Sequence, residues 1–187
     1  MDMSTAKLRS WFLAGAVASS AAALATSDAL AVPREGASAP NATLEDADGR
    51  VSDLKALRGK PILIVYEDRD SAKQNEPLKK ELGELARGDR YKSRIALAAV
   101  ADVSAWDFWP AKGFVKDAIR DESKKQGTTI YCDWTGAFRD TYKLRRGVSS
   151  VVLVGKDGRV VFAAEGPVPA EQRKRLLGLL REQVEGG

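Results

Sequence analysis

An unbroken apolar run that leads into a short polar loop and then a helical pattern constrains this chain more than any other feature. The run 62–65, Ile-Leu-Ile-Val, lacks the alternation of a half-exposed strand, which is typical of a parallel strand covered on both faces. Residues 61–66 are therefore predicted to form a central strand. Apolar residues then recur at helical spacing over 71–86, where Pro77 is expected to kink the helix.

The remaining patterns alternate between strand and helix and end in a hairpin. They predict strands at 95–100 and 128–131, helices at 113–126, at 137–144 and from 169 onward, a hairpin of 151–154 with 160–162, and a short hairpin around the turn 46–50. In the helix at 113–126, Phe114 is expected to face the core. This order predicts an α/β fold, with a central mixed sheet, parallel strands first, an antiparallel pair last and helices on both faces.

The N-terminus has the pattern of a secretory signal peptide. Lys7 and Arg9 precede the apolar, Ala-rich run 11–24, and Ala29-Leu30-Ala31 fits an A-x-A cleavage site. The run is short for a membrane anchor, and no later segment could span a bilayer. We expect a signal peptide over 1–31 and one domain over 32–187, periplasmic or secreted, with no span in the mature chain.

Composition excludes several classes of protein. With no histidine, the chain cannot form a Ser-His-Asp triad or a His-based metal site, and its one cysteine, Cys132, cannot form an intramolecular disulfide. The net charge of +4 comes from basic clusters that lie beside acidic residues, so we expect no nucleic-acid partner. No cofactor is expected, and the sequence does not indicate an oligomeric state.

The predicted order of elements is that of a thioredoxin-like fold, in which a C-x-x-C pair follows the central strand. Here Ser71 and Gln74 stand at the two cysteine positions, so the usual thiol chemistry has no nucleophile. Ser149 stands where this fold has a cis-proline, and we expect a trans Val148-Ser149 bond because a non-proline cis bond costs about 3 kcal/mol.

Residues 68–75 and residues 149–160, Ser-Ser-Val-Val-Leu-Val-Gly-Lys-Asp-Gly-Arg-Val, resemble two segments of the YtfJ family of exported proteins. Residues 68–75, Asp-Arg-Asp-Ser-Ala-Lys-Gln-Asn, are similar to the family's G-R-T-S-A-K-x-x-N-x-x-L segment, although Asp68 replaces the glycine and Asn75 lies one position closer to Lys73. The second segment is 149–160, and residues 36–40 and 57–61 have a redoxin-like pattern. The resemblance implies a periplasmic thioredoxin-like fold without catalytic cysteines, and it implies no particular reaction.

Ser71 and Gln74 also fit an S-x-x-Q capping box, which predicts that they cap the helix that starts at residue 71. A functional serine is the alternative, with Lys73 as the only nearby base. Cys132, after the strand 128–131, is interpreted as a partly buried thiol. Its alternatives are an intermolecular disulfide and a divergent thiol peroxidase or reductase.

Acidic residues follow two predicted strands and raise the alternative of a divalent-cation site. Glu67, Asp68 and Asp70 follow the first strand and Asp102 follows the second, at the edge where ligands of open α/β sheets gather. A solvated loop with capping carboxylates is the simpler interpretation, because Arg69 and Lys73 compete for those charges.

Three large rings, Trp106, Phe108 and Trp109, lie in a loop that ends in a proline. They form either a contact surface for a partner or a lid packed on the sheet. The leading hypothesis is a non-catalytic module that binds a periplasmic protein or peptide. Its predicted groove is made by Glu67, Asp68, Arg69, Asp70, Ser71, Lys73, Gln74, Trp106, Phe108, Trp109, Ser149 and Ser150.

Overall fold

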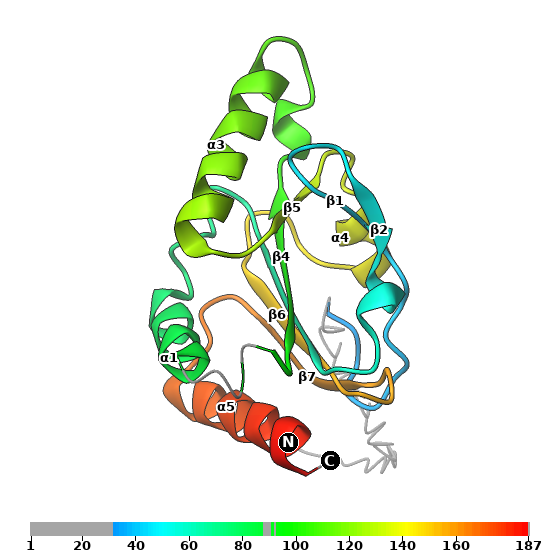
Figure 1. Ribbon diagram of the computed structural model, residues 1–187, viewed down its shortest axis with the longest axis vertical. Coiled ribbons are helices and arrows are strands. Elements are labelled where there is room, and N and C mark those ends of the chain that lie inside the picture. Colours follow the sequence, from blue (N-terminus) through cyan, green and yellow to red (C-terminus); the bar gives the residue numbers. More distant parts are fainter. Residues whose placement is uncertain (1–31, 88–90, 92, 187) are drawn as a thin grey trace, which may run out of the picture.

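A five-stranded mixed sheet forms the centre of the molecule in the computed structural model, which describes residues 32–87, 91 and 93–186 (Figure 1). The predicted signal peptide, 1–31, lies outside the described residues. The strands are β1 (Thr43–Glu45), β2 (Val51–Asp53), β3 (Ile62–Glu67), β4 (Ala96–Asp102), β5 (Ile130–Asp133), β6 (Ser150–Val154) and β7 (Val160–Glu165). The helices are α1 (Glu76–Ala86), α3 (Ala111–Gln126), α4 (Ala137–Tyr142) and α5 (Ala170–Glu185), with short 3-10 turns η1 (Leu54–Leu57) and η2 (Ser104–Trp106).

The sheet has the predicted topology. Its order is β5-β4-β3-β6-β7, with β3, β4 and β5 parallel to one another and β6 and β7 antiparallel to their neighbours. The fully buried Ile64 of β3 pairs with Ala98 on one side and Val152 on the other. Such a strand must be apolar on both faces, which explains its unalternated sequence. The α/β fold class and the mixed sheet are confirmed.

Two apolar layers hold the helices to the sheet. On one face, Leu176 and Leu180 of α5 and Leu78 of α1 pack against β6 and β7. On the other face, Phe138 of α4 lies between the rings of Tyr66 and Tyr142, at centroid distances of 5.7 and 4.8 Å. The hairpin β1–β2 closes that side (Figure 1). No helix among the described residues is long and apolar enough to cross a bilayer.

Several predicted boundaries were wrong, and the first helix matters most. Residues 71–75 form turns, and α1 begins only at Glu76, with Pro77 in its first turn. Pro77 therefore does not kink a helix, because the first turn needs no backbone donor from it. Cys132 lies inside β5, which runs two residues beyond the predicted strand end. Phe114, predicted to face the core, is exposed on α3.

Candidate functional site

The loop after β3 is organised by the carboxylate of Asp68. Its Oδ1 accepts hydrogen bonds from the amides of Asp70 (3.1 Å) and Ser71 (2.8 Å) and from Ser71 Oγ (2.7 Å). Ser71 is completely buried, and its Oγ also accepts the amide of Asp68 at 2.9 Å. The single hydroxyl proton of Ser71 is therefore used within the loop, and the oxygen is buried away from a substrate.

The predicted capping box does not form. Ser71 bonds back to Asp68 and lies five residues before α1, whose N-cap residue is Asn75. The side chain of Gln74 reaches across to the loop before β6 instead of back to Ser71. Sequence spacing suggested a cap only because the helix was expected to start at residue 71.

Side chains of the first loop bind the backbone of the loop before β6. Gly147 donates its amide to Asp68 Oδ2 (2.8 Å) and accepts from Gln74 Nε2 (3.2 Å), and Ser149 donates its amide to Gln74 Oε1 (3.0 Å). Gly147 has a φ of 75°, which favours glycine. A peptide that paired with these backbone groups would have to displace the protein's own side chains.

A buried layer beneath these loops centres on Asn75. Its Nδ2 donates to Ser149 Oγ (2.8 Å) and to the carbonyl of Gly166 (3.0 Å), and its Oδ1 accepts the amide of Val168 (2.8 Å). Ser149 Oγ donates to Glu67 Oε1 at 2.9 Å. Asn75 was missed as a site residue, because its position was taken for the interior of a helix.

Glu67 forms polar contacts, and Ser149 and Ser150 at the start of β6 are buried. Glu67 Oε2 is paired with Lys79 Nζ at 2.5 Å. Ser149 and Ser150 are fully buried, and Ser150 Oγ has no hydrogen-bond partner among the described residues. The Val148-Ser149 bond is trans as predicted, since the cis bond found in the described chain is Trp109-Pro110. We call the hydrogen-bonded set Glu67, Asp68, Ser71, Gln74, Asn75, Lys79, Gly147 and Ser149 the closed network.

A second buried polar cluster lies where β3, β4 and β5 end. Tyr66 donates its hydroxyl to Asp133 Oδ2 (3.0 Å), and Arg139 pairs with Asp102 Oδ2 at 2.9 Å. Asp102 also accepts the hydroxyl of Ser104 at 2.6 Å. Burial raises the pKa of Asp102, but hydrogen bonds from Ser104 and Arg139 outweigh it and lower that pKa below its ordinary value. Of the residues in this cluster, the sequence patterns indicated only Asp102 as a candidate site residue.

The metal alternative gains no support from this geometry. In the described part of the chain, no three His, Cys, Asp or Glu side chains gather as a metal ion would require. The carboxylates of Glu67 and Asp68 are held by the closed network, and Asp102 pairs with Arg139.

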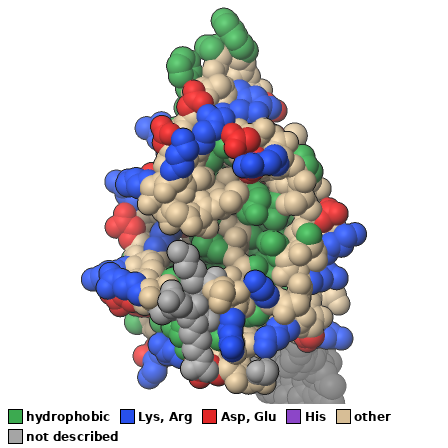
Figure 2. All heavy atoms as spheres, in the orientation of Figure 1, with side chains coloured by type: hydrophobic (Ala, Val, Ile, Leu, Met, Phe, Trp, Pro, Cys, Tyr) green, Lys and Arg blue, Asp and Glu red, His purple; other side chains and the backbone are tan. Residues whose placement is uncertain are grey.

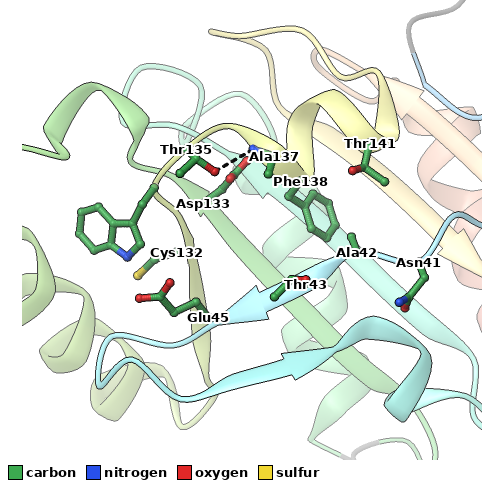
Figure 3. Close-up of a pocket in the computed structure, with 11 residues that line it drawn as sticks. Asn41, Ala42, Thr43, Glu45, Cys132, Asp133, Thr135, Ala137, Phe138 and Thr141 are labelled. Atoms are coloured by element: carbon green, nitrogen blue, oxygen red, sulfur yellow. Dashed lines mark hydrogen bonds between the residues drawn. The ribbon is translucent and has the colours of Figure 1, made fainter.

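Cys132 lies at the wall of a cavity of about 240 Å³ between the segment 41–45, the end of β5 and α4 (Figure 3). The cysteine is 5% exposed and packs with Trp134 and Val103. Burial, together with the nearby charge of Glu45, raises the pKa of the thiol to about 12. Thiolate is the reactive form of cysteine, so this environment disfavours thiol chemistry.

We expect Cys132 to react slowly with a thiol reagent in the folded protein. At pH 8 a pKa near 12 reduces the thiolate fraction by roughly a thousandfold relative to an ordinary cysteine. The rate of reaction with 5,5′-dithiobis(2-nitrobenzoate) should therefore differ by at least that factor between folded and urea-unfolded protein. Equal rates in the two states would contradict the buried, protonated thiol.

The aromatic loop is exposed. The exposed fraction is 91% for Trp109, 56% for Phe108 and 38% for Trp106, and Phe114 on the adjoining first turns of α3 reaches 73%. These residues cap the end of the molecule where η2 leads into α3, and hydrophobic side chains are visible at that end in Figure 2. The lid alternative is wrong for Phe108 and Trp109. We call Trp106, Phe108, Trp109 and Phe114 the aromatic apex.

The structure joins some of the predicted groove residues and not others. The closed network links five of them through hydrogen bonds, namely Glu67, Asp68, Ser71, Gln74 and Ser149. Arg69, Asp70 and Lys73 are exposed beside it. Within the described ranges, no hydrogen bond or ion pair connects the loop 104–110 with this network.

Asp68 makes the stability of the closed network dependent on pH. Burial raises its pKa, but hydrogen bonds from Ser71, Gly147 and Asp70 lower it below the ordinary value of 3.8. Because the pKa of Asp68 is lower in the folded than in the unfolded protein, its ionised carboxylate stabilises the folded state at pH values above the unfolded pKa. This stabilisation is lost as the pH falls through the pKa of the folded state.

We therefore expect Asp68→Asn to lower the free energy of unfolding by a constant amount above pH 5, and by less as pH falls below 3.8. Urea unfolding at a series of pH values measures this. Asp70→Asn is the matched control, because the Asp70 side chain accepts no hydrogen bond in the described structure. If the free energy of unfolding differed between the wild type and Asp68→Asn by the same amount down to pH 2, the lowered pKa assigned to Asp68 would be contradicted.

These features define a class of protein, a thioredoxin-like domain in which hydrogen-bonded side chains occupy the redox position. The model of the family of bacterial proteins of unknown function designated YtfJ_HI0045 matches residues 52–183, and the chain belongs to that family. No curated protein matches the chain closely enough to count as a relative.

Solved structures support the fold. An uncharacterised conserved protein from Geobacillus kaustophilus is 16% identical with a TM-score of 0.62, covering 82% of this chain and 83% of its own. A candidate protein disulfide isomerase from Bacteroides thetaiotaomicron is 19% identical with a TM-score of 0.58, covering 81% and 91%. A thiol peroxidase from Chromobacterium violaceum is 16% identical with a TM-score of 0.55, covering 81% and 88%. At these identities the similarity shows the thioredoxin-like fold alone.

Proposed function

We propose that this protein is an exported, non-catalytic module that binds a protein or peptide partner through the aromatic apex. The observation that carries the proposal is the exposure of Trp109, Phe108 and Phe114 at one end of the molecule. Large aromatic side chains dominate the energetics of protein interfaces, and a contiguous exposed apolar patch marks an interaction site.

The closed network supports a non-catalytic role. Its hydroxyls, Ser71 and Ser149, are fully buried and each is held by neighbouring polar groups. A serine nucleophile needs a general base and access to substrate, and these serines have no access. Cys132, the only thiol, is buried and its pKa is raised to about 12. We therefore do not propose the peroxidase or reductase alternative.

Export rests on the N-terminal sequence. The pattern of Lys7, Arg9, the apolar run and Ala29-Leu30-Ala31 supports cleavage after Ala31. N-terminal sequencing of the protein from the periplasm or medium should begin at Val32. Recovery of the uncleaved chain from the cytoplasm would contradict export.

Site-specific photocrosslinking tests the binding role. A photoreactive phenylalanine analogue at Phe108 should crosslink to a defined polypeptide, and Trp109→Ala should reduce that crosslink at least tenfold. Val51→Ala is the matched control, because Val51 is an exposed apolar side chain (65%) on β2, away from the aromatic apex. Crosslinks only to lipid, or equal losses in both variants, would contradict the proposal.

A further inference from the structure

The positive charge of this protein is concentrated in two short segments. The whole chain has a net charge of +4. Residues 69–73 and 143–146 together contain five basic residues and one acidic residue, an excess of four, so the rest of the chain is balanced. The basic residues are Arg69, Lys73, Lys143, Arg145 and Arg146, which we call the cationic rim.

The closed network brings the two segments together. Gly147, which follows Arg146, is hydrogen-bonded to Asp68 and Gln74, which directly flank the segment 69–73. All five rim residues are exposed. In the described structure, Arg145 pairs with Glu165 at 2.8 Å, whereas the other four cations have no ion pair.

Acidic groups nearby compensate part of this charge, and one of them is Glu76, which is exposed three residues after Lys73. Asp70 is exposed between Arg69 and Lys73. Glu67 is paired with Lys79, and Asp140 lies 3.4 Å from Arg139. Asp68 adds a negative charge, but its carboxylate accepts four hydrogen bonds from the two loops. Four exposed cations without an ion pair in the described chain thus lie on two segments that the closed network joins.

We propose that the cationic rim binds an acidic segment of a protein or peptide, an inference that rests on the proposed function and specifies its partner. Carboxylates on an extended segment can pair with several separate cations at once, and such complementarity raises the association rate and selects among partners. A membrane surface fits less well, because interfacial binding uses cations and apolar rings on one face. Here no hydrogen bond or ion pair joins the rim to the loop of the aromatic apex in the described chain.

Fluorescence anisotropy of a labelled octaglutamate peptide with the purified protein tests the inference. We expect saturable binding that weakens as salt rises, and no binding of octalysine. Lys73→Glu with Arg146→Glu should weaken octaglutamate binding at least tenfold. Lys174→Glu with Arg181→Glu makes the same charge change at exposed positions on α5 that have no ion pair with another described residue. This double variant should weaken binding less than threefold.

Equal losses in the two double variants would show that overall charge drives binding and would overturn the inference. Binding to vesicles of phosphatidylcholine and phosphatidylglycerol, lost in the rim variant and without octaglutamate binding, would overturn it in favour of a lipid. The Phe108 crosslink, measured with Trp109→Ala, is a separate readout of the proposed function. Failure of one experiment is therefore distinguishable from failure of the other.

Discussion

Replacing Asn75 with alanine is expected to lower the free energy of unfolding by about 3 kcal/mol. Asn75 is 2% exposed and satisfies Ser149 Oγ, the carbonyl of Gly166 and the amide of Val168. Without it, these buried groups lose their shared partner, and each unsatisfied group costs about 1–3 kcal/mol unless water enters. Urea unfolding at pH 7 measures the loss.

Asn41→Ala is the matched control for that variant. Asn41 also uses both ends of its amide, with Asp53 and the backbone of Lys55, but it does so at the exposed surface. We expect a loss of less than about 1 kcal/mol, because water replaces both partners. If both variants lost the same free energy of unfolding, the hydrogen bonds of Asn75 in the closed network would contribute no more to stability than those of an exposed turn.

Replacing Arg139 with methionine is expected to cost about 3 kcal/mol at pH 7, because it leaves the buried carboxylate of Asp102 without its cation. The Asp102 side chain is 2% exposed. Because the pKa of Asp102 is lowered in the folded state, this carboxylate stabilises the wild type at pH values above its ordinary pKa of 3.8. That stabilisation is lost as the pH falls through the pKa of the folded state. Without Arg139, burial favours protonation, so the difference between wild type and variant should shrink below that pH.

Two further variants test that assignment. Adding Asp102→Asn to Arg139→Met should recover part of the stability at pH 7, because the buried charge is removed together with its partner. Arg120→Met removes a surface cation from its pairs with Asp48 and Asp117 and should change stability little. A loss in Arg139→Met that was independent of pH, with no recovery in the double variant, would contradict a buried ion pair.

Sequence patterns predicted the fold well, because its strands and helices depend on local periodicity. The unalternated run in β3 and the Asp157-Gly158 turn before β7 each follow from neighbouring residues. The predicted start of the first helix at residue 71 was wrong. Ser71 and Gln74 match the S-x-x-Q pattern of a capping box, although they do not cap α1. The Gln74 side chain instead forms hydrogen bonds with the backbone of residues 147 and 149, more than seventy positions away in the sequence.

The candidate site was harder to predict for the same reason. Asn75, Lys79 and Arg139 act through partners that are distant in sequence or lie on other elements, and no local pattern marks them. The aromatic loop was recognised from its composition, but exposure depends on where η2 and α3 lie relative to the sheet. Phe114 was assigned to the core because helical spacing does not show that α3 extends beyond the sheet edge (Figure 1).

The closed network explains how this fold can exist without its redox centre. In place of two sulfurs, the side chains of Asp68 and Gln74 accept hydrogen bonds from backbone amides of the loop before β6, and Asn75 joins both loops to the segment after β7. Residues at the usual redox positions are thus part of the closed network, and the surfaces we propose for a partner, the aromatic apex and the cationic rim, are exposed.

Turnover of peroxide and of a disulfide substrate by the purified protein, beside a Cys132→Ser variant, tests whether this domain is catalytic. We predict no turnover above the uncatalysed rate in either protein, because the redox position has no sulfur and the Cys132 thiol is buried and protonated. Turnover by the wild type that disappears in Cys132→Ser would contradict this prediction and establish an enzyme that works through a single cysteine.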